Sequence, residues 1–202
     1  MQRNTQEPKA QPLHLTRLAP TPSGFLHLGN VLSFAITTYF AHRHGSKIWL
    51  RIDDLDTDRI QQEYVEDIFD SLKFLNLPWH IGPPDSDELK AQWSQLHRSP
   101  EYNQVLQTLA DNGHVFACTC SRAQIAKHGS LGYPGTCLHK NIPLDSPGVQ
   151  WRIKTDASIQ MRMQALKNKD YLSVLPQNMQ HFVVRRKDGY PTYQLSSLTD
   201  DV

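Results

Sequence analysis

Two short motifs bring together residue types that suit phosphate and carboxylate chemistry. The first motif is a Pro-Thr-Pro-Ser-Gly turn followed by His27-Leu28-Gly29, and the second is Arg51-Ile52-Asp53-Asp54-Leu55-Asp56. A histidine just before a helix can donate a hydrogen bond to a phosphate oxygen, and the helix N-terminus adds its unpaired N–H groups. A glycine at position 29 leaves that approach free of a side chain. The arrangement suits the binding of ATP beside a small acid.

Activation of a carboxylate by ATP asks little of general acids or bases, because the carboxylate oxygen is itself the nucleophile. Such a site must position both reactants and stabilise the charge that spreads over the phosphate. Taken alone, His27 could equally be a partly buried loop histidine and the proline cluster only a turn. The choice between a phosphate-binding histidine and a simple loop histidine therefore depends on the surrounding elements and motifs.

Three cysteines, Cys118, Cys120 and Cys137, fall in or beside a Gly/Pro-rich stretch from 127 to 148. An odd number of cysteines in a chain without an export signal argues against a disulfide framework. The spacing predicts a structural zinc site, and the competing interpretation is two buried cysteines and an unrelated third. Structural zinc supplies on the order of 10 kcal/mol of folding free energy in small modules, enough to order a stretch that has little core of its own.

The fourth ligand of this zinc has two candidates in the sequence. Tyr133 offers a phenol oxygen, whereas His139 offers an imidazole, which is the commoner zinc ligand. Spacing alone leaves both open.

Composition indicates a soluble chain with room for one good core, or one core and a small insert. The 202 residues are 39% hydrophobic and 20% charged, with a net charge of +1 and a pI of about 7.8, so charge neither demands nor excludes nucleic acid. No apolar run reaches the ~18 residues of a membrane span, and the polar opening lacks a signal peptide. We expect a cytoplasmic protein that does not use a membrane, with a flexible tail at 1–13, a domain at 14–202 and an insert at about 115–148.

The hydrophobic pattern around the two motifs predicts a parallel crossover unit. A strand at 14–19, a helix at 31–44 ended by Gly45, and a strand at 47–52 follow one another with short turns. In such units the ligand site lies at the carboxyl ends of the strands, which is where both motifs fall.

The rest of the chain gives a mixed pattern of helices and strands. We expect a helix at 61–75, a surface connection at 82–98 and a helix from Ser99 to about Gly113. Further strands are expected at 115–118, 149–153, 181–186 and 190–195, the last two joined by the hairpin signal Lys187-Asp188-Gly189.

Arg17 to Asp56 resembles the nucleotide-binding half-site of the class I glutamyl-tRNA synthetase group. That group reads R-x-A-P-[ST]-P-[ST]-G-x-L-H-x-G and then R-[IF]-E-D-[TI]-D-x-x-R, and eight matching positions disfavour a chance turn. The cysteine and tyrosine spacing looks like the zinc site of glutamyl-Q tRNA(Asp) synthetases, short paralogues that attach glutamate to queuosine in the tRNA(Asp) anticodon. The resemblance implies an α/β fold, a Rossmann-like parallel sheet of class I aminoacyl-tRNA synthetases with a small zinc-bearing insert.

The resemblance also implies roles for individual residues. Arg17 would bind the glutamate carboxylate, and Asp53 stands where the family has a glutamate that contacts the ammonium group, its carboxylate set back by about 1.5 Å. The implied glutamate-binding set is Arg17, Ala19, Thr21, Asp53 and Tyr193. The implied ATP-binding set is Pro20, His27 and Gly29, the catalytic set is His27, Gly29 and Asn30, and the metal set is Cys118, Cys120, Tyr133 and Cys137. Asn30 replaces the histidine that many members have at the fourth motif position.

Near its end the chain resembles two further family segments. Arg186 to Tyr193 resembles R-x-D-G-x-[PF]-x-Y, and Asp200-Asp201 resembles the acid pair that follows. Family members continue with a glutamate-binding arginine, the rest of the sheet and a K-[ML]-S-K loop, so the chain looks C-terminally shortened.

The resemblance implies ATP-dependent activation of L-glutamate and its transfer to tRNA(Asp), with structural Zn²⁺, with Mg²⁺ accompanying ATP, and with a complementing C-terminal subunit as a candidate partner. Two alternatives remain. One is a non-catalytic zinc-containing paralogue that binds nucleotide or amino acid, and the other is a fragment of a glutamyl-tRNA synthetase.

Overall fold

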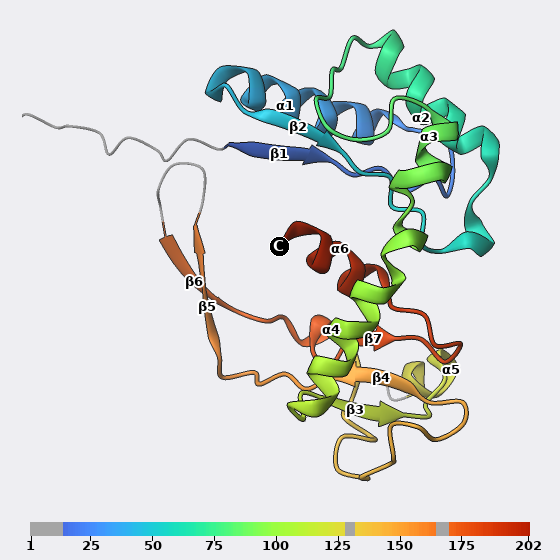
Figure 1. The fold of residues 1–202 in the computed structure, drawn as a ribbon. Helices are drawn as coiled ribbons and strands as arrows, with labels where there is room; N and C mark the ends of the chain where they lie inside the picture. The colour runs from blue at the N-terminus through green and yellow to red at the C-terminus, as the bar shows by residue number, and fades with distance from the viewer. Residues whose placement is uncertain (1–13, 128–131, 165–169) are drawn as a thin grey trace, which may run out of the picture. The chain divides into compact units, whose positions relative to one another are not determined.

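The computed structural model describes residues 14–127, 132–164 and 170–202 (Figure 1). The tail predicted at 1–13 and part of the predicted insert, residues 128–131, lie outside the described residues. The chain divides into two compact units, one ending at Arg98 and the other beginning at Ser99. Among the described residues, none of the helices has the length and apolar character needed to cross a membrane.

The first unit contains the predicted crossover. Strand β1 (Leu15–Leu18) pairs in parallel with β2 (Lys47–Leu50), and helix α1 (Leu28–His44) joins them. The helix begins three residues earlier than predicted, because His27 caps it. Gly45 ends it in the left-handed conformation, at φ 64°, as the sequence predicted.

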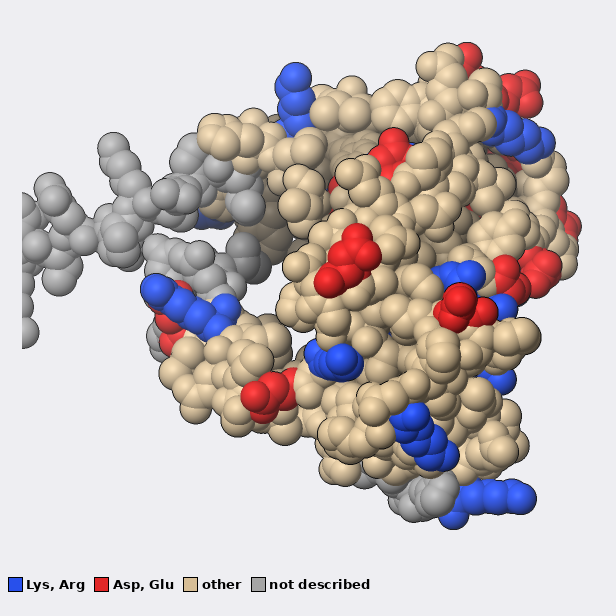
Figure 2. Space-filling model, turned by 60° about the horizontal axis from the view of Figure 1, so that its bottom comes forward, with Lys and Arg blue, Asp and Glu red and all other residues tan. Residues whose placement is uncertain are grey.

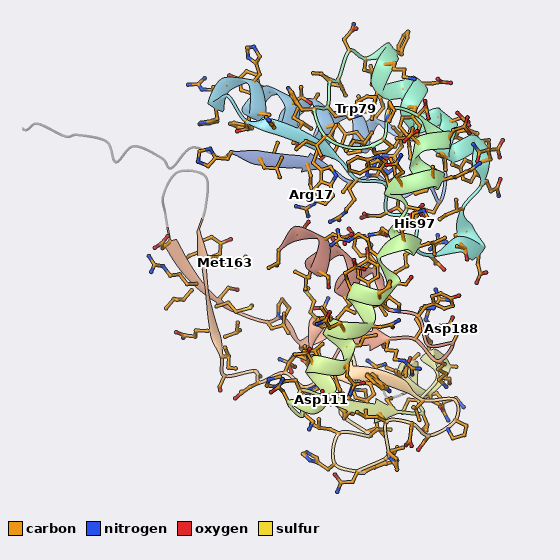
Figure 3. The ribbon with its side chains drawn as sticks, in the orientation of Figure 1. Arg17, Trp79, His97, Asp111, Met163 and Asp188 are labelled. Carbon is orange, nitrogen blue, oxygen red and sulfur yellow. The ribbon has the colours of Figure 1, made fainter. Side chains whose placement is uncertain are left out.

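Alternation along β1 and β2 separates a core face from an opposite face. Leu18, Ile48 and Leu50 point to the side where α1 and α2 (Gln62–Phe74) pack, and each is at most 2% exposed. Arg17 lies opposite Trp49 in the register, so both point to the other side. Figure 3 shows Arg17 on the side of β1 away from α1.

The stretch 82–98 was expected to be a surface connection, and this expectation is wrong. It folds into successive helical turns: α3 (Ser86–Glu88), a π-helical turn η2 (Leu89–Trp93) and a 3₁₀ turn η3 (Gln95–Arg98). Asp85 caps the first turn by accepting from the N–H groups of Asp87 and Glu88, and Leu89 is buried in the core. A short 3₁₀ turn η1 (Thr57–Arg59) lies ahead of α2.

The second unit is built on a three-stranded antiparallel sheet in the order β3-β4-β7. Its strands are β3 (Val115–Cys118), β4 (Gln150–Ile153) and β7 (Val183–Arg185), which confirms the three strands expected there to within a few residues. The helices are α4 (Ser99–Asp111), α5 (Arg122–Ala126), the 3₁₀ turn η4 (Gln177–Met179) and α6 (Tyr193–Asp201), and β5 (Gln160–Gln164) pairs with β6 (Asp170–Val174). The sequence did not indicate α5, η4, β5 or β6.

The strand expected at 190–195 is wrong, although the turn before it forms. The N–H of Arg186 donates to the carbonyl of Tyr190 at 2.7 Å, and Pro191 forms a single bridge with Arg185. Pro191 has no N–H to extend the ladder, and the chain enters α6 at Tyr193. Helix α6 carries the expected acid pair. Asp200, its first member, helps to fix the helix by accepting from the Tyr102 hydroxyl at 2.9 and 3.1 Å.

Candidate active site and candidate metal centre

The two motifs lie side by side where β1 and β2 end. The N–H of Arg51 donates to the Leu18 carbonyl at 2.9 Å, and the N–H of Asp53 donates to the Pro20 carbonyl at 2.9 Å. These bonds continue the parallel pairing beyond both strands, so the proline loop and the acidic loop run together. The carboxyl end of a parallel sheet is where ligands bind in this class of fold.

His27 is held by the helix that it caps. Its Nδ1 accepts from the N–H groups of Gly29 at 3.1 Å and Asn30 at 3.4 Å, and the Asn30 side chain accepts from the His27 N–H at 3.2 Å. Because Nδ1 is an acceptor, the neutral ring carries its proton on Nε2. The exposed imidazole therefore presents an N–H donor beside the helix N-terminus.

Gly29 makes room for that ring. A Cβ at position 29 would lie 2.9 Å from His27 Cε1 and 3.0 Å from Nδ1, closer than side chains approach one another. Gly29 was expected to keep the approach of a ligand free of a side chain, and in the structure His27 itself occupies the adjacent space.

Asp53 forms a buried ion pair with Arg51. Arg51 Nε lies 2.6 Å from Asp53 Oδ1 and Nη2 lies 3.2 Å from Oδ2, with the two side chains 3% and 1% exposed. Gln95 Nε2 also approaches Asp53 Oδ1, at 3.4 Å. Any ammonium group that meets this carboxylate must therefore share it with the Arg51 guanidinium.

Asp54 is linked to the same buried region through the turn that follows Trp93. The Gln95 N–H donates to Asp54 Oδ1 at 2.8 Å. Desolvation raises the pKa of Asp54, and hydrogen bonds from Ser94 and from the Gln95 N–H oppose that shift without cancelling it. Gln95 is 2% exposed and was missed by the sequence argument, because a glutamine in an expected surface stretch carries no signal.

The other predicted site residues fall in both units. Arg17 and Thr21 are exposed, Ala19 and Asn30 are partly exposed, and Pro20 is buried, all in the first unit. Tyr193 begins α6 in the second unit and is 56% exposed. Backbone bonds thus bring the predicted residues of the proline loop beside Asp53, and His27, Gly29 and Asn30 lie at the start of α1.

The three cysteines of the second unit gather into one cluster. Their Sγ atoms all lie within 4.8 Å of one another, and the Cys120 and Cys137 sulfurs are 3.6 Å apart. Zinc binds thiolate sulfur at about 2.3 Å, so two thiolates on one tetrahedral ion lie roughly 4 Å apart. The donor set and its spacing therefore fit a metal ion such as zinc.

Tyr133 points into this cluster. Its hydroxyl lies 3.4 Å from Cys118 Sγ and accepts from the Cys137 N–H at 2.7 Å, and the residue is 8% exposed. His139, the other candidate fourth ligand, is exposed.

Burial and hydrogen bonding shift the pKa values of Cys120 and Cys137 in opposite directions. Burial, followed by contacts with the neighbouring thiols, raises the pKa of Cys120 to about 11. Burial also acts to raise the pKa of Cys137, but hydrogen bonds from the Thr119 N–H and Tyr133 outweigh it and lower that pKa to about 7. Burial raises the pKa of Tyr133 as well. Cys137 thus loses its proton more readily than Cys120.

On the face that Figure 2 shows, basic and acidic side chains lie in small separate groups and form no single charged patch. This pattern agrees with the near-neutral net charge of +1.

Comparison with known proteins decides the family. The model for tRNA synthetases class I (E and Q), catalytic domain, matches residues 14–202. The chain belongs to this family. Its fold is that of the class I catalytic domain, with the cysteine cluster as a candidate metal site.

Among curated relatives of this catalytic-domain family, the glutamyl-Q tRNA(Asp) synthetase of Nitratidesulfovibrio vulgaris is 34% identical over 201 residues, covering 92% of this chain and 61% of the relative. A glutamate tRNA ligase from Elizabethkingia meningosepticum, solved in complex with its amino acid, superposes with a TM-score of 0.72 at 20% identity over 95% of this chain and 42% of that one. The glutamate-tRNA synthetase of Elizabethkingia anophelis gives a TM-score of 0.72 at 21% identity over 93% and 42%. The chain thus spans less than two thirds of the length of these relatives.

Proposed function

We propose that this class I catalytic domain activates L-glutamate with ATP and serves its transfer to queuosine in tRNA(Asp). The observation that carries the proposal is the pairing of the two motif loops at one end of the sheet, through the Arg51–Leu18 and Asp53–Pro20 backbone hydrogen bonds. The 34% identity to a glutamyl-Q tRNA(Asp) synthetase favours this branch of the family.

The ATP side of the proposed site centres on His27. Its Nε2–H would donate to a phosphate oxygen while Nδ1 keeps the first turn of α1 capped, and the same turn offers N–H groups to the developing charge. Pro20, Gly29 and Asn30 complete this side, with Mg²⁺ accompanying the nucleotide. The histidine is thus oriented before ATP arrives.

The glutamate side combines a cation with carboxylate and hydroxyl groups. Arg17 projects from the face of β1 opposite the core and would bind a substrate carboxylate through its planar guanidinium. Ala19, Thr21, Asp53 and Tyr193 are the further residues that we assign to the amino acid.

For the metal centre we propose structural zinc held by Cys118, Cys120, Cys137 and Tyr133. The inward-pointing Tyr133 hydroxyl supports the phenol over the exposed His139 as fourth ligand. Zinc would tie β3 to the irregular stretch that carries Cys137, which we keep as an insert at about 115–148 within a catalytic domain at 14–202.

We also propose that a further polypeptide completes the first unit. Apolar side chains at Leu28, Leu32, Ile36 and Tyr39 recur on the outer side of α1 and are 47–85% exposed, although the opposite side of the helix is already buried in the core. A helix that is apolar on both sides is normally buried on both, and parallel sheets are normally covered on both faces. The relatives' additional length supplies a candidate for this cover, as part of the same chain or as a separate subunit in the cytoplasm.

The test is glutamate-dependent ATP–pyrophosphate exchange by the purified chain, first without tRNA and then with queuosine-containing tRNA(Asp). We expect exchange, restored by the complementing polypeptide if the chain alone is inactive.

In calorimetry, Arg17→Ala should weaken glutamate binding by about tenfold or more while leaving ATP binding nearly unchanged, because a bidentate charged contact contributes roughly 1.5–3 kcal/mol. Equal losses for both ligands would contradict the role of Arg17.

The zinc assignment has its own test. Cys120→Ser should release zinc and lower the thermal midpoint, because the metal orders a stretch with little core. His139→Ala is the matched control, and it should keep both the metal content and the midpoint. Zinc retained by the cysteine variant would reject the proposed ligand set.

The second candidate function is a non-catalytic paralogue that binds nucleotide or amino acid. The buried Arg51–Asp53 pair favours it, because this pair already uses the carboxylate that the substrate ammonium group would need. A folded, zinc-loaded preparation that binds ATP but shows no exchange, even with the complementing polypeptide, would favour this candidate.

A further inference from the structure

One face of the β3–β4 pair underlies the cysteine cluster. Cys118 lies opposite Gln150 in the register, and Phe116 lies opposite Arg152. Because side chains alternate along a strand, these four residues share one face of the sheet. Gln150 already serves the cluster there, since its Nε2 lies 3.7 Å from Cys118 Sγ and donates to the Cys120 carbonyl at 3.2 Å.

Arg152 is a buried cation on that same face. It is 6% exposed, its guanidinium carbon lies 3.9 Å from the centre of the Tyr133 ring, and Nη1 donates to the His181 carbonyl at 2.8 Å. Its Nε has no hydrogen-bond partner, and none of the carboxylates within the described ranges forms an ion pair with it. A charged side chain is rarely buried in this way unless some opposite charge compensates it.

The surroundings hold Arg152 and Tyr133 firmly together. The His181 ring meets the Tyr133 ring edge-on at 6.4 Å and the Phe116 ring edge-on at 5.8 Å. His181 is in turn fixed by Thr155, whose N–H donates to His181 Nδ1 at 3.2 Å. The Tyr133 hydroxyl therefore points at Cys118 and Cys137 from a ring that is packed on several sides.

A metal–thiolate centre would supply the missing negative charge. Three thiolates outweigh the two positive charges of a zinc ion, and a phenolate ligand would add one more negative charge. Opposite charges attract one another more strongly in a buried, low-dielectric region than in water.

We propose that Arg152 is the counter-cation of the cysteine metal centre and the residue that positions Tyr133 as a ligand. This inference depends on the metal site under Proposed function and not on the synthetase activity. Arg152 does not itself bind the metal. It stacks on the tyrosine ring and balances the net negative charge of the loaded cluster.

The test compares metal affinity among matched variants. Arg152→Met keeps the length and loses the charge, and Arg152→Lys keeps the charge and loses the planar stack. Arg185→Met is the control, because Arg185 also stacks on an aromatic ring in this unit, that of Trp151 at 4.9 Å, but does not contact the cluster. Zinc affinity is measured by competition with a chromophoric chelator.

We expect Arg152→Met to weaken zinc binding about 10- to 100-fold, as loss of groups that orient metal ligands commonly does, with Arg152→Lys intermediate and Arg185→Met unchanged. Thermal midpoints provide a second readout. Arg152→Met should lower the midpoint of the zinc-loaded protein by more than it lowers that of the protein kept in EDTA, since the uncompensated cation is a liability only without metal.

Unchanged zinc affinity in both Arg152 variants, or equal midpoint losses with zinc and with EDTA, would overturn the proposal. If Arg152→Met fails to fold, the affinity of Arg152→Lys decides. Failure of the unmodified chain to bind zinc would refute the metal centre itself, whereas absent pyrophosphate exchange with normal zinc binding would leave this inference standing.

Discussion

The buried Arg51–Asp53 pair gives the most demanding test of the first unit. Arg51→Met or Asp53→Asn removes one charge of a pair whose side chains are at most 3% exposed. Removing one member of a buried pair typically costs about 3–5 kcal/mol of unfolding free energy. The two contacts, at 2.6 and 3.2 Å, are charge-assisted and worth roughly 1.5–3 kcal/mol each.

The double variant separates this pair from the other contacts of each residue. In a double-mutant cycle we expect a coupling of about 2–3 kcal/mol, near the upper end for residues in contact. The assay is urea unfolding followed by tryptophan fluorescence in a Trp151→Phe background. The remaining tryptophans, Trp49, Trp79 and Trp93, all belong to the first unit, so the signal reports on that unit alone.

Additive effects, with a coupling below about 0.5 kcal/mol, would refute the reasoning. Such a result would mean that Asp53 is stabilised chiefly by other groups, and that its carboxylate remains available to a substrate ammonium group. A strong coupling would instead mean that amino-acid binding at Asp53 has to compete with Arg51.

Two further predictions concern single carboxylates. Burial raises the pKa of Asp54, so the folded state favours the protonated carboxyl. The stability that this preference contributes is fully present below the ordinary aspartate pKa and is lost as the pH rises through the pKa of Asp54 in the folded protein. The Asp54→Asn side chain cannot ionise, so the stability of this variant relative to the unmodified chain should improve between about pH 4 and pH 7. Urea midpoints that change in parallel for the two proteins over that range would contradict this prediction. Tyr102→Phe removes the hydroxyl that donates to buried Asp200 and should destabilise the second unit by about 1.5–3 kcal/mol, measured as loss of hydrogen-exchange protection in α4 and α6, with no change in the first unit.

The crossover and both motif positions were predictable because their signals are local. The strand–helix–strand pattern, the glycine at position 45 and the loop composition each depend on neighbouring residues. His27 was expected just before a helix, but the exact start of α1 at Leu28 was not predicted, because the pairing of His27 with Asn30 is visible only in three dimensions. Helix propensity at 82–98 was similarly hidden by prolines and acidic residues that suggested a surface loop.

The candidate metal centre could be predicted from the sequence only in part. Ligand type and spacing indicated the Cys118, Cys120 and Cys137 cluster, and the structure brings these sulfurs together. Gln150 and Arg152 could not be found in the same way, because their place beside the cluster depends on the antiparallel register between β3 and β4. Metal-ligand residues can be found from short spacings in a sequence, whereas the residues that pack around them are brought there by strand pairing between distant parts of the chain.

Within the candidate active site, the surroundings of His27 and of Asp53 should respond differently to sequence change. His27 is oriented by contacts within three residues of itself, so its geometry can survive remodelling of the rest of the unit. Asp53 depends on Gln95, more than forty positions away, and on Arg51, so its availability changes with the packing of a distant turn. Under the proposed function, nucleotide binding should accordingly be the more robust property, and amino-acid selection should be where divergence from the relatives appears first.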